Sequence, residues 1–263
     1  MGGLGGWIRC ARRVVVTGGT VAHQLALGTG AAIDPAASLS RALAHLAREH
    51  GLSIEVVGEL PRRPCVLVAN HVSYLDPIAL LALVPAHPLC KGEVGRWPLI
   101  GAVARARGVL LVDRACAWSG ARVLRRALAA LRAGSSVLNF PEGTTTRGDQ
   151  VLPFRRGIFG AAALAQVPIV PVALSYADPG AAWVGDETFV PHYLRTAGKE
   201  RVAVRAAFGA PMWPGRRAAA ELAAEARQRI LTLLELERSH HVAAERVRVP
   251  EARPDPVLPA AVG

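Results

Sequence analysis

A histidine and an aspartate separated by four residues are the clearest candidates for chemistry in this sequence. His71 and Asp76 lie in the segment NHVSYLDP, directly after the apolar run 65–69. Such a run is typical of a buried parallel strand, and ligands of α/β proteins bind beyond the carboxyl ends of these strands. A histidine can take the proton from a hydroxyl nucleophile while a carboxylate orients its ring. The pair therefore predicts acid–base chemistry on a hydroxyl group, provided that the loop turns back on itself.

The same two residues also have a purely structural interpretation. Asp76 precedes Pro77, which is the pattern of a helix N-cap followed by proline at the first helical position. The chain contains eight histidines, so this spacing also arises by chance. The two interpretations are compatible, because a capping carboxylate can also orient a neighbouring imidazole. The pair by itself leaves both open.

Three further segments carry notable residues at or near predicted strands. The segment FPEGTTTRG (140–148) follows an apolar strand and offers backbone amides, hydroxyls and one carboxylate, that of Glu142. In the segment GVLLVDR (108–114), a predicted strand is followed by the positively charged Arg114. The segment VPIVPV (167–172) is an apolar strand with two prolines, which favour an edge strand or a channel wall over a central position.

Taken in their order along the chain, the four segments resemble the glycerolipid acyltransferase family typified by 1-acylglycerol-3-phosphate acyltransferases. That family has an NHx4D block, a G-x(n)-R block, an FPEG block and a VP-x-x-P block, and all four occur within about residues 65–174. The resemblance implies an O-acyltransferase that moves a fatty acyl group from acyl carrier protein or coenzyme A to the free hydroxyl of a lysolipid. We expect no metal or other cofactor, because the sequence has no metal-ligand spacing and no GxGxxG segment that opens a helix.

The resemblance also implies a role for each matching residue. His71 is the general base that acts on the acceptor hydroxyl, and Asp76 is its partner. Five further residues match positions of the family and are expected to bind the acceptor: Lys91, Arg114, Glu142, Gly143 and Thr144.

One departure from the family affects the choice of acceptor. Glycerol-phosphate members usually read FPEGTRS, with an arginine that contacts phosphate, whereas Thr145 stands at that position here and the nearest arginine is Arg147. We expect 1-acyl-sn-glycerol-3-phosphate as the acceptor, with phosphatidic acid as product, because it is the commonest acceptor in the superfamily; lyso-ornithine lipid is the alternative. The missing arginine and the connecting sequence instead favour lyso-ornithine lipid, a phosphate-free aminolipid. Another lysophospholipid is the third alternative.

Strand and helix patterns alternate along the chain and predict the α/β class. We expect a single domain whose mostly parallel sheet is flanked by helices and preceded by an N-terminal helical membrane-anchoring segment. The expected strands are 53–58, 65–69, 109–112, 136–140, 169–175 and 201–208, and the expected helices are 37–50, 77–83, 118–133, 158–165 and 216–237. The boundaries are 1–51 for membrane-associating helices, 52–238 for the acyltransferase domain and 239–263 for a disordered tail.

The N-terminal region contains an uncharged stretch, 14–33, that is long enough for a membrane span. Gly, Thr, His23 and Gln24 dilute its apolar character, so we expect a helix that lies in or on the membrane. Arg9, Arg12 and Arg13 precede it and suit anionic head groups. A secretory signal peptide is the alternative. We expect a peripheral or monotopic protein at the cytoplasmic face of the bacterial inner membrane.

Composition narrows the classes of protein that remain. Of 263 residues, 51% are hydrophobic, which excludes a disordered chain, and four cysteines without CxxC spacing exclude a disulfide scaffold. The net charge of +11 comes from 29 arginines and two lysines, a bias typical of a GC-rich genome. Aromatic residues make up only 5% and are not interleaved with arginine clusters, which disfavours a nucleic-acid binder.

Four arginines of the predicted helix 118–133 form a basic face. This face would suit an acidic carrier protein or anionic lipid, or it is simply a solvated surface.

Overall fold

The computed structural model describes residues 3–28, 34–113, 116–185 and 187–246, and within them seven strands form one sheet. The strand order is β1-β7-β6-β2-β5-β3-β4, and only β6 and β7 run antiparallel among these neighbours. The mixed α/β fold with a mostly parallel sheet is therefore confirmed. The strands are β1 (Leu52–Val57), β2 (Val66–Ala69), β3 (Ala86–Lys91), β4 (Leu110–Val112), β5 (Ser136–Asn139), β6 (Ile169–Tyr176) and β7 (Val202–Phe208).

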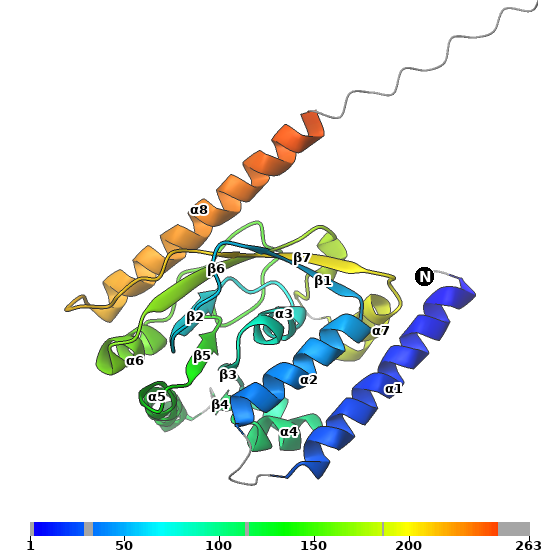
Figure 1. Ribbon diagram of the computed structural model, residues 1–263, viewed down its shortest axis with the longest axis horizontal. Helices are drawn as coiled ribbons and strands as arrows, with labels where there is room; N and C mark the ends of the chain where they lie inside the picture. Colours follow the sequence, from blue (N-terminus) through cyan, green and yellow to red (C-terminus); the bar gives the residue numbers. More distant parts are fainter. Residues whose placement is uncertain (1–2, 29–33, 114–115, 186, 247–263) are drawn as a thin grey trace, which may run out of the picture.

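Helices cover both faces of the sheet (Figure 1). α2 and α3 pack on one face, with α1, α4 and α7 beyond them, whereas α5, α6 and α8 pack on the other. The helices are α1 (Leu4–Ala26), α2 (Pro35–Glu49), α3 (Leu75–Leu83), α4 (Ile100–Ala106), α5 (Ala117–Arg132), α6 (Gly157–Ala165), α7 (Phe189–Ala197) and α8 (Ala219–Arg246), with short 3-10 turns η1 (Gly92–Arg96) and η2 (Pro179–Ala181).

β2 illustrates why the central strands read as continuous apolar runs. Val66 and Val68 face the core under α5, α6 and α8, while Leu67 and Ala69 face the core under α2 and α3. All four side chains are fully buried. Successive side chains of a strand point to opposite faces, so a strand covered on both faces must be apolar at every position.

The prediction of an edge position for the two-proline segment is wrong. β6 lies between β2 and β7, near the middle of the sheet. Pro171 is tolerated there because its carbonyl accepts a hydrogen bond from Gly209 N on the β7 side, and the missing N–H faces the same side. The ladder between β6 and β7 is interrupted at this point, since three residues separate Phe208 from Met212 but only two separate Ile169 from Val172.

Three described elements were missing from the sequence prediction, namely β3, α4 and α7. β3 carries two polar interruptions, His87 and Lys91, and α4 spans only seven residues, so neither has a long periodic pattern. At the other end, α8 continues to Arg246 where we predicted a tail from Ser239 onward. The rest of that predicted tail lies outside the described residues.

Two buried arginines attach α1 to the rest of the domain. Arg13 is 3% exposed and donates to the carbonyls of Glu49, Ala197, Lys199 and Glu200, at or just beyond the ends of α2 and α7. Arg107 is 1% exposed and donates to Gln24 and to the carbonyl of Gly28, at the end of α1. Helix C-termini carry partial negative charge, so these carbonyls offset the cost of burying a cation.

The outer face of α1 exposes large apolar side chains. Leu4, Ile8 and Val15 are 77%, 59% and 73% exposed, and Trp7 is also exposed. Among the described residues, no helix combines the length and the apolar character needed to cross a bilayer. The N-terminal helix that we predicted is present from Leu4 to Ala26, whereas 29–33 lie outside the described residues.

Candidate active site

The loop between β2 and α3 carries the predicted His-x4-Asp pair, and Asn70 fixes where it starts. The Asn70 amide donates to the Leu174 carbonyl and accepts from the Leu174 N–H, at 2.9 and 2.7 Å. These two bonds attach the end of β2 to β6. The loop therefore leaves the sheet at the carboxyl ends of two neighbouring parallel strands, where α/β proteins place ligands.

His71 and Asp76 lie together at this edge. His71 Nδ1 is 2.7 Å from Asp76 Oδ2, and the Asp76 side chain is fully buried while that of His71 is 21% exposed. A carboxylate on Nδ1 holds the proton on that nitrogen, so Nε2 is left as the basic nitrogen. The arrangement has the geometry of a histidine general base oriented by a buried carboxylate.

The Asp76 carboxylate accepts hydrogen bonds from three further groups besides the His71 ring. Oδ2 also accepts from the backbone N–H groups of Val72 and Ser73, and Oδ1 accepts from the Tyr176 hydroxyl at 2.6 Å. Asp76 is the second residue of α3 and not its N-cap, so the predicted capping position is wrong, although the carboxylate does bind backbone N–H groups before the helix. Four donors on one buried carboxylate fix the orientation of the His71 ring.

The segment that follows β5 supports His71 from behind. The Phe140 ring stacks on the imidazole with centroids 4.2 Å apart. The Glu142 carboxylate accepts from the His71 N–H at 2.8 Å and from the Leu152 N–H at 2.7 Å. Burial raises the pKa of Glu142, and its two backbone hydrogen bonds oppose that rise. Glu142 therefore holds the backbone of His71 in place.

The next residues of this loop turn toward the segment that follows β6. Gly143 has φ +78°, a left-handed conformation that favours glycine. The Thr145 hydroxyl donates to the backbone carbonyl of Trp183. The backbone N–H of Trp183 in turn donates to the backbone carbonyl of Val72. Thr145 thus joins the loop after β5 to the segment after β6, and it presents no charge.

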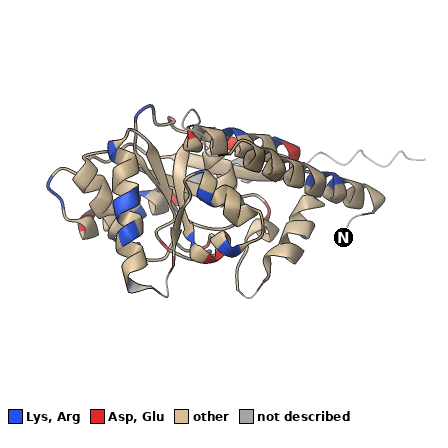
Figure 2. Cartoon of the chain, turned by 90° about the horizontal axis from the view of Figure 1, so that it is seen from below, with Lys and Arg blue, Asp and Glu red and all other residues tan. Residues whose placement is uncertain are grey.

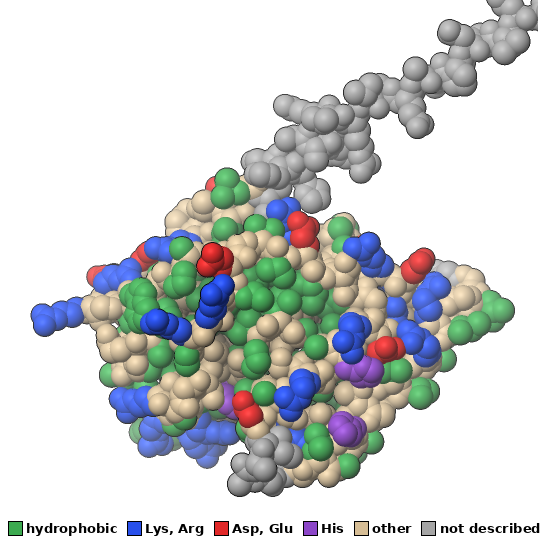
Figure 3. Space-filling view, viewed as in Figure 1, with side chains coloured by type: hydrophobic (Ala, Val, Ile, Leu, Met, Phe, Trp, Pro, Cys, Tyr) green, Lys and Arg blue, Asp and Glu red, His purple; other side chains and the backbone are tan. Residues whose placement is uncertain are grey.

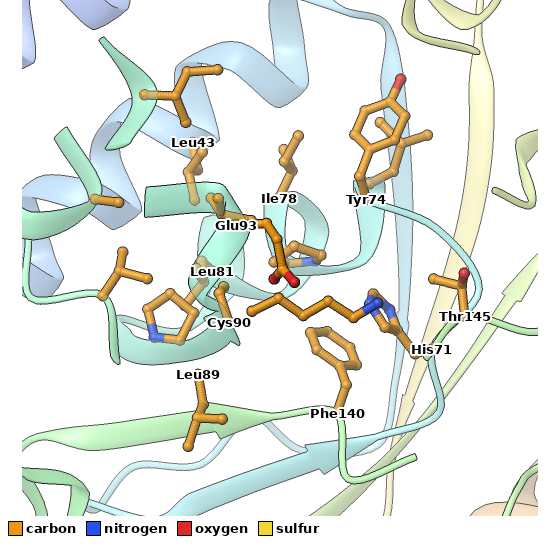
Figure 4. A pocket seen from close by; sticks show the side chains of 18 of the residues that line it. Leu43, His71, Tyr74, Ile78, Leu81, Leu89, Cys90, Glu93, Phe140 and Thr145 are labelled. Carbon is orange, nitrogen blue, oxygen red and sulfur yellow. The ribbon is translucent and has the colours of Figure 1, made fainter. Parts of the chain in front are cut away.

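A cavity of about 850 Å³ opens beside His71. Its walls come from α1, α2, α3, β3, α4 and α5 and are mostly apolar, with Leu43, Ile78, Leu81 and Leu89 among them. Figure 4 shows His71 and Phe140 on one side of this space and the carboxylate of Glu93 extending into it. An apolar space of this size that ends at a base is suited to a long hydrocarbon chain with a reactive polar end.

The other predicted acceptor-binding residues divide into three groups. Lys91, Gly143 and Thr144 line the cavity. Glu142 is 5% exposed, does not line it, and contacts the backbone of the loop instead. Arg114 lies outside the described residues.

Sequence reasoning missed Tyr176 and Glu93. Tyr176 is the last residue of β6, and nothing in its sequence context indicates that β6 lies beside β2. Burial and the neighbouring Asp76 carboxylate raise the pKa of Tyr176 well above its usual value, so the phenol remains a donor. Glu93 follows Lys91 closely, and the segment KGEVGRWP was the signal that could have identified it.

The fold and site define an α/β protein with a His–Asp pair beside an apolar cavity, and comparisons with known proteins specify the family. A family model described as Acyltransferase matches residues 53–175. The lyso-ornithine lipid O-acyltransferase of Pseudomonas aeruginosa is 37% identical over 194 residues, which cover 72% of this chain and 74% of that protein. The chain belongs to the acyltransferase family.

Two further proteins extend the comparison. The 1-acyl-sn-glycerol-3-phosphate acyltransferase of Neisseria gonorrhoeae is 31% identical over 144 residues, covering 54% of this chain and 55% of that protein. The crystal structure of the 1-acyl-sn-glycerophosphate acyltransferase PlsC from Thermotoga maritima has a TM-score of 0.57 and 19% identity, and the match covers 93% of this chain and 98% of that one. At that identity the structural match shows the fold alone.

Proposed function

We propose that this protein transfers a fatty acyl group from a thioester donor to the free hydroxyl of a lysolipid. His71 Nε2 takes the proton of the acceptor hydroxyl as its oxygen attacks the thioester carbonyl. The tetrahedral intermediate then expels the thiolate, which receives the proton from the imidazolium. The new ester and a free thiol are the products.

The observation that carries this proposal is the position of the His71–Asp76 pair at the edge of the apolar cavity. Burying one methylene group stabilises a bound chain by about 0.8 kcal/mol, so a cavity lined by leucine, isoleucine and valine favours a long acyl group. The reacting carbonyl would then lie at the polar end of the cavity, beside the imidazole.

We further propose lyso-ornithine lipid as the acceptor. The FPEGTRS motif of the glycerol-phosphate acyltransferases has a phosphate-binding arginine where this chain has the neutral Thr145, whose hydroxyl donates to the carbonyl of Trp183. Lys91 and Glu93 both line the cavity and offer one positive and one negative charge. An ornithine head group carries a carboxylate and an amine, and it matches such a pair better than a phosphate does. The similarity to the Pseudomonas relative over most of both chains supports this choice.

The second candidate acceptor is 1-acyl-sn-glycerol-3-phosphate, which is also called lysophosphatidate. The Neisseria relative named for 1-acyl-sn-glycerol-3-phosphate supports it, and so does the exposed cation Lys91 at the cavity. A phosphate held without a guanidinium fork would be held less specifically, because lysine offers no bidentate contact.

The lysolipid would reach the site from a membrane surface. We propose that the exposed apolar face of α1, with Leu4, Ile8 and Val15, lies in the interfacial region of the bilayer. Val190 and Leu194 on α7, which packs beside α1, are also exposed apolar side chains.

Acyl transfer by the purified, detergent-supported protein tests the proposal. Lyso-ornithine lipid and lysophosphatidate are offered in parallel with palmitoyl-acyl carrier protein or palmitoyl coenzyme A, and His71→Ala is the blank. We expect ester formation on lyso-ornithine lipid and a loss of at least about 100-fold in the blank. Ester formation on lysophosphatidate alone would reject our choice of acceptor, and equal rates with the His71→Ala variant would reject the mechanism.

A further inference from the structure

The outer surface of α5 carries an unusual group of side chains. Arg122, Arg125 and Arg126 are exposed, and Trp118 is 82% exposed on the same helix. We call these four residues the α5 arginine face. The helix contains no acidic residue. Figure 2 shows the resulting bands of positive charge on this helix, and Figure 3 shows them as a cluster at the lower left of the molecule, over α5.

What distinguishes this face is that its arginines are grouped on one helix that offers them no acidic partner. Several, though not all, of the exposed or partly exposed arginines elsewhere in the described chain form ion pairs with glutamates. Such pairs join Arg12 to Glu49, Arg195 to Glu187, and both Arg217 and Arg229 to Glu225. The three arginines of the α5 arginine face form no ion pair or side-chain hydrogen bond with any described residue. Their charge is therefore available to a partner.

The helix that carries the α5 arginine face also forms part of the cavity wall. Gly120, Val123 and Leu124, on the inner side of α5, line the same cavity as His71. Arg155, at the start of the segment that leads into α6, lines it too and is also exposed. A partner bound on the outer side of α5 would therefore lie across this one helix from the cavity.

The α5 arginine face and the exposed apolar face of α1 lie at opposite ends of the molecule in both Figure 1 and Figure 2. A flat bilayer that contacts the outer side of α1 would not also cover α5. Arginine and tryptophan are among the residue types that are enriched in protein–protein interfaces. These observations favour an acidic protein over an anionic lipid surface.

We propose that the α5 arginine face docks an acidic acyl carrier protein, which delivers the acyl thioester into the cavity from the end opposite to the membrane. This inference rests on the proposed acyl transfer and specifies its donor. Complementary charge steers such a partner to its site and accelerates association, mainly at low salt.

The experiment compares two triple charge reversals with equal changes in net charge. One variant carries Arg122→Glu, Arg125→Glu and Arg126→Glu. The matched control carries Arg48→Glu, Arg62→Glu and Arg63→Glu, whose exposed side chains lie outside α5. Each protein is assayed with palmitoyl-acyl carrier protein and with palmitoyl coenzyme A, and binding of acyl carrier protein is measured separately without turnover.

With the carrier-protein donor, we expect the kcat/KM of the α5 variant to fall by at least about 10-fold. Its affinity for acyl carrier protein should fall by at least the same factor. Its kcat/KM with palmitoyl coenzyme A should stay within about twofold of wild type, and the control should resemble wild type with both donors. The wild-type rate with the carrier-protein donor should fall with added salt, because exposed charges are screened within about 8 Å at physiological ionic strength.

Three results would overturn the proposal. These are equal carrier-protein binding by the wild type and the α5 variant, equal losses with both donors, or a loss of binding to anionic vesicles with no change in donor use. Carrier-protein binding that depends on the α5 arginine face without acyl transfer to any lysolipid would leave the docking site intact and reject the proposed function instead.

Discussion

Tyr176 and Asp76, a hundred positions apart in the sequence, are joined by a hydrogen bond of 2.6 Å from the phenol to the carboxylate. The same carboxylate binds His71 through its other oxygen. The last residue of β6 thus acts on the proposed base through a single intermediate group. Tyr176 is not among the residues that line the cavity, so we interpret it as a positioning residue.

The first prediction concerns Tyr176→Phe. The substitution removes one donor from a buried, charged acceptor, and such hydrogen bonds contribute about 1.5–3 kcal/mol. We expect kcat to fall by about 10-fold while the KM for the acceptor stays within about twofold, as measured by initial rates of ester formation.

Ser136→Ala is the control for this prediction. It removes another buried hydroxyl, one that accepts from the Cys65 N–H at the opposite end of the sheet. We expect Ser136→Ala to lower the melting temperature without lowering kcat. If both variants lose kcat and stability in the same proportion, Tyr176 has only a structural role.

The second prediction concerns Glu142, which contacts backbone N–H groups of His71 and Leu152 and not the cavity. In Glu142→Gln, one of these N–H groups faces an amide nitrogen in place of an oxygen, so the loop loses an anchor. We expect kcat to fall by about 10-fold or more with little change in the KM for the acceptor.

Thr144→Ala provides the opposite pattern for comparison, because Thr144 lines the cavity. We expect it to raise the KM for the acceptor and to leave kcat nearly unchanged. A rise in KM with preserved kcat in Glu142→Gln would favour direct contact with the acceptor, as the family resemblance implies, over the positioning role.

The sequence was sufficient for the fold class and for the approach of His71 to Asp76, and the reasons are local. β2 is buried on both faces and therefore reads as an apolar run, and the histidine and aspartate are only five residues apart. The position of Tyr176 depends instead on β6 lying beside β2, and strand order is not encoded in any short segment. The error over Pro171 has the same origin, because the interruption that accommodates it is formed with β7.

The third prediction concerns Thr145→Arg. A guanidinium at this loop position offers a bidentate contact to phosphate, which a threonine hydroxyl engaged by the Trp183 carbonyl does not. We expect the ratio of kcat/KM for lysophosphatidate to that for lyso-ornithine lipid to rise by at least about 10-fold.

Thr145→Val separates the effect of the charge from the loss of the hydroxyl. It removes the bond to Trp183 without adding a cation, so we expect lower activity with both acceptors and an unchanged ratio. If Thr145→Val changes the ratio as much as Thr145→Arg does, the preference does not arise from phosphate binding at this position.

The last prediction concerns pH and stability at His192. This residue is fully buried, its Nε2 lies 3.0 Å from the Ala182 carbonyl, and its Nδ1 has no hydrogen-bond partner among the described residues. Burial lowers the pKa of His192, and it also lowers the pKa of His50. The unfolded chain therefore takes up protons below about pH 6.5 that the folded chain does not. Stability should be constant above that pH and should fall below it, by up to about 1.4 kcal/mol per pH unit for each such histidine.

Melting temperatures measured from pH 8 to pH 5 should show this fall in stability. The His192→Gln variant should be less stable than the wild type at pH 8 but less sensitive to acid. Parallel curves for the wild type and His192→Gln would mean that His192 does not contribute to the acid sensitivity.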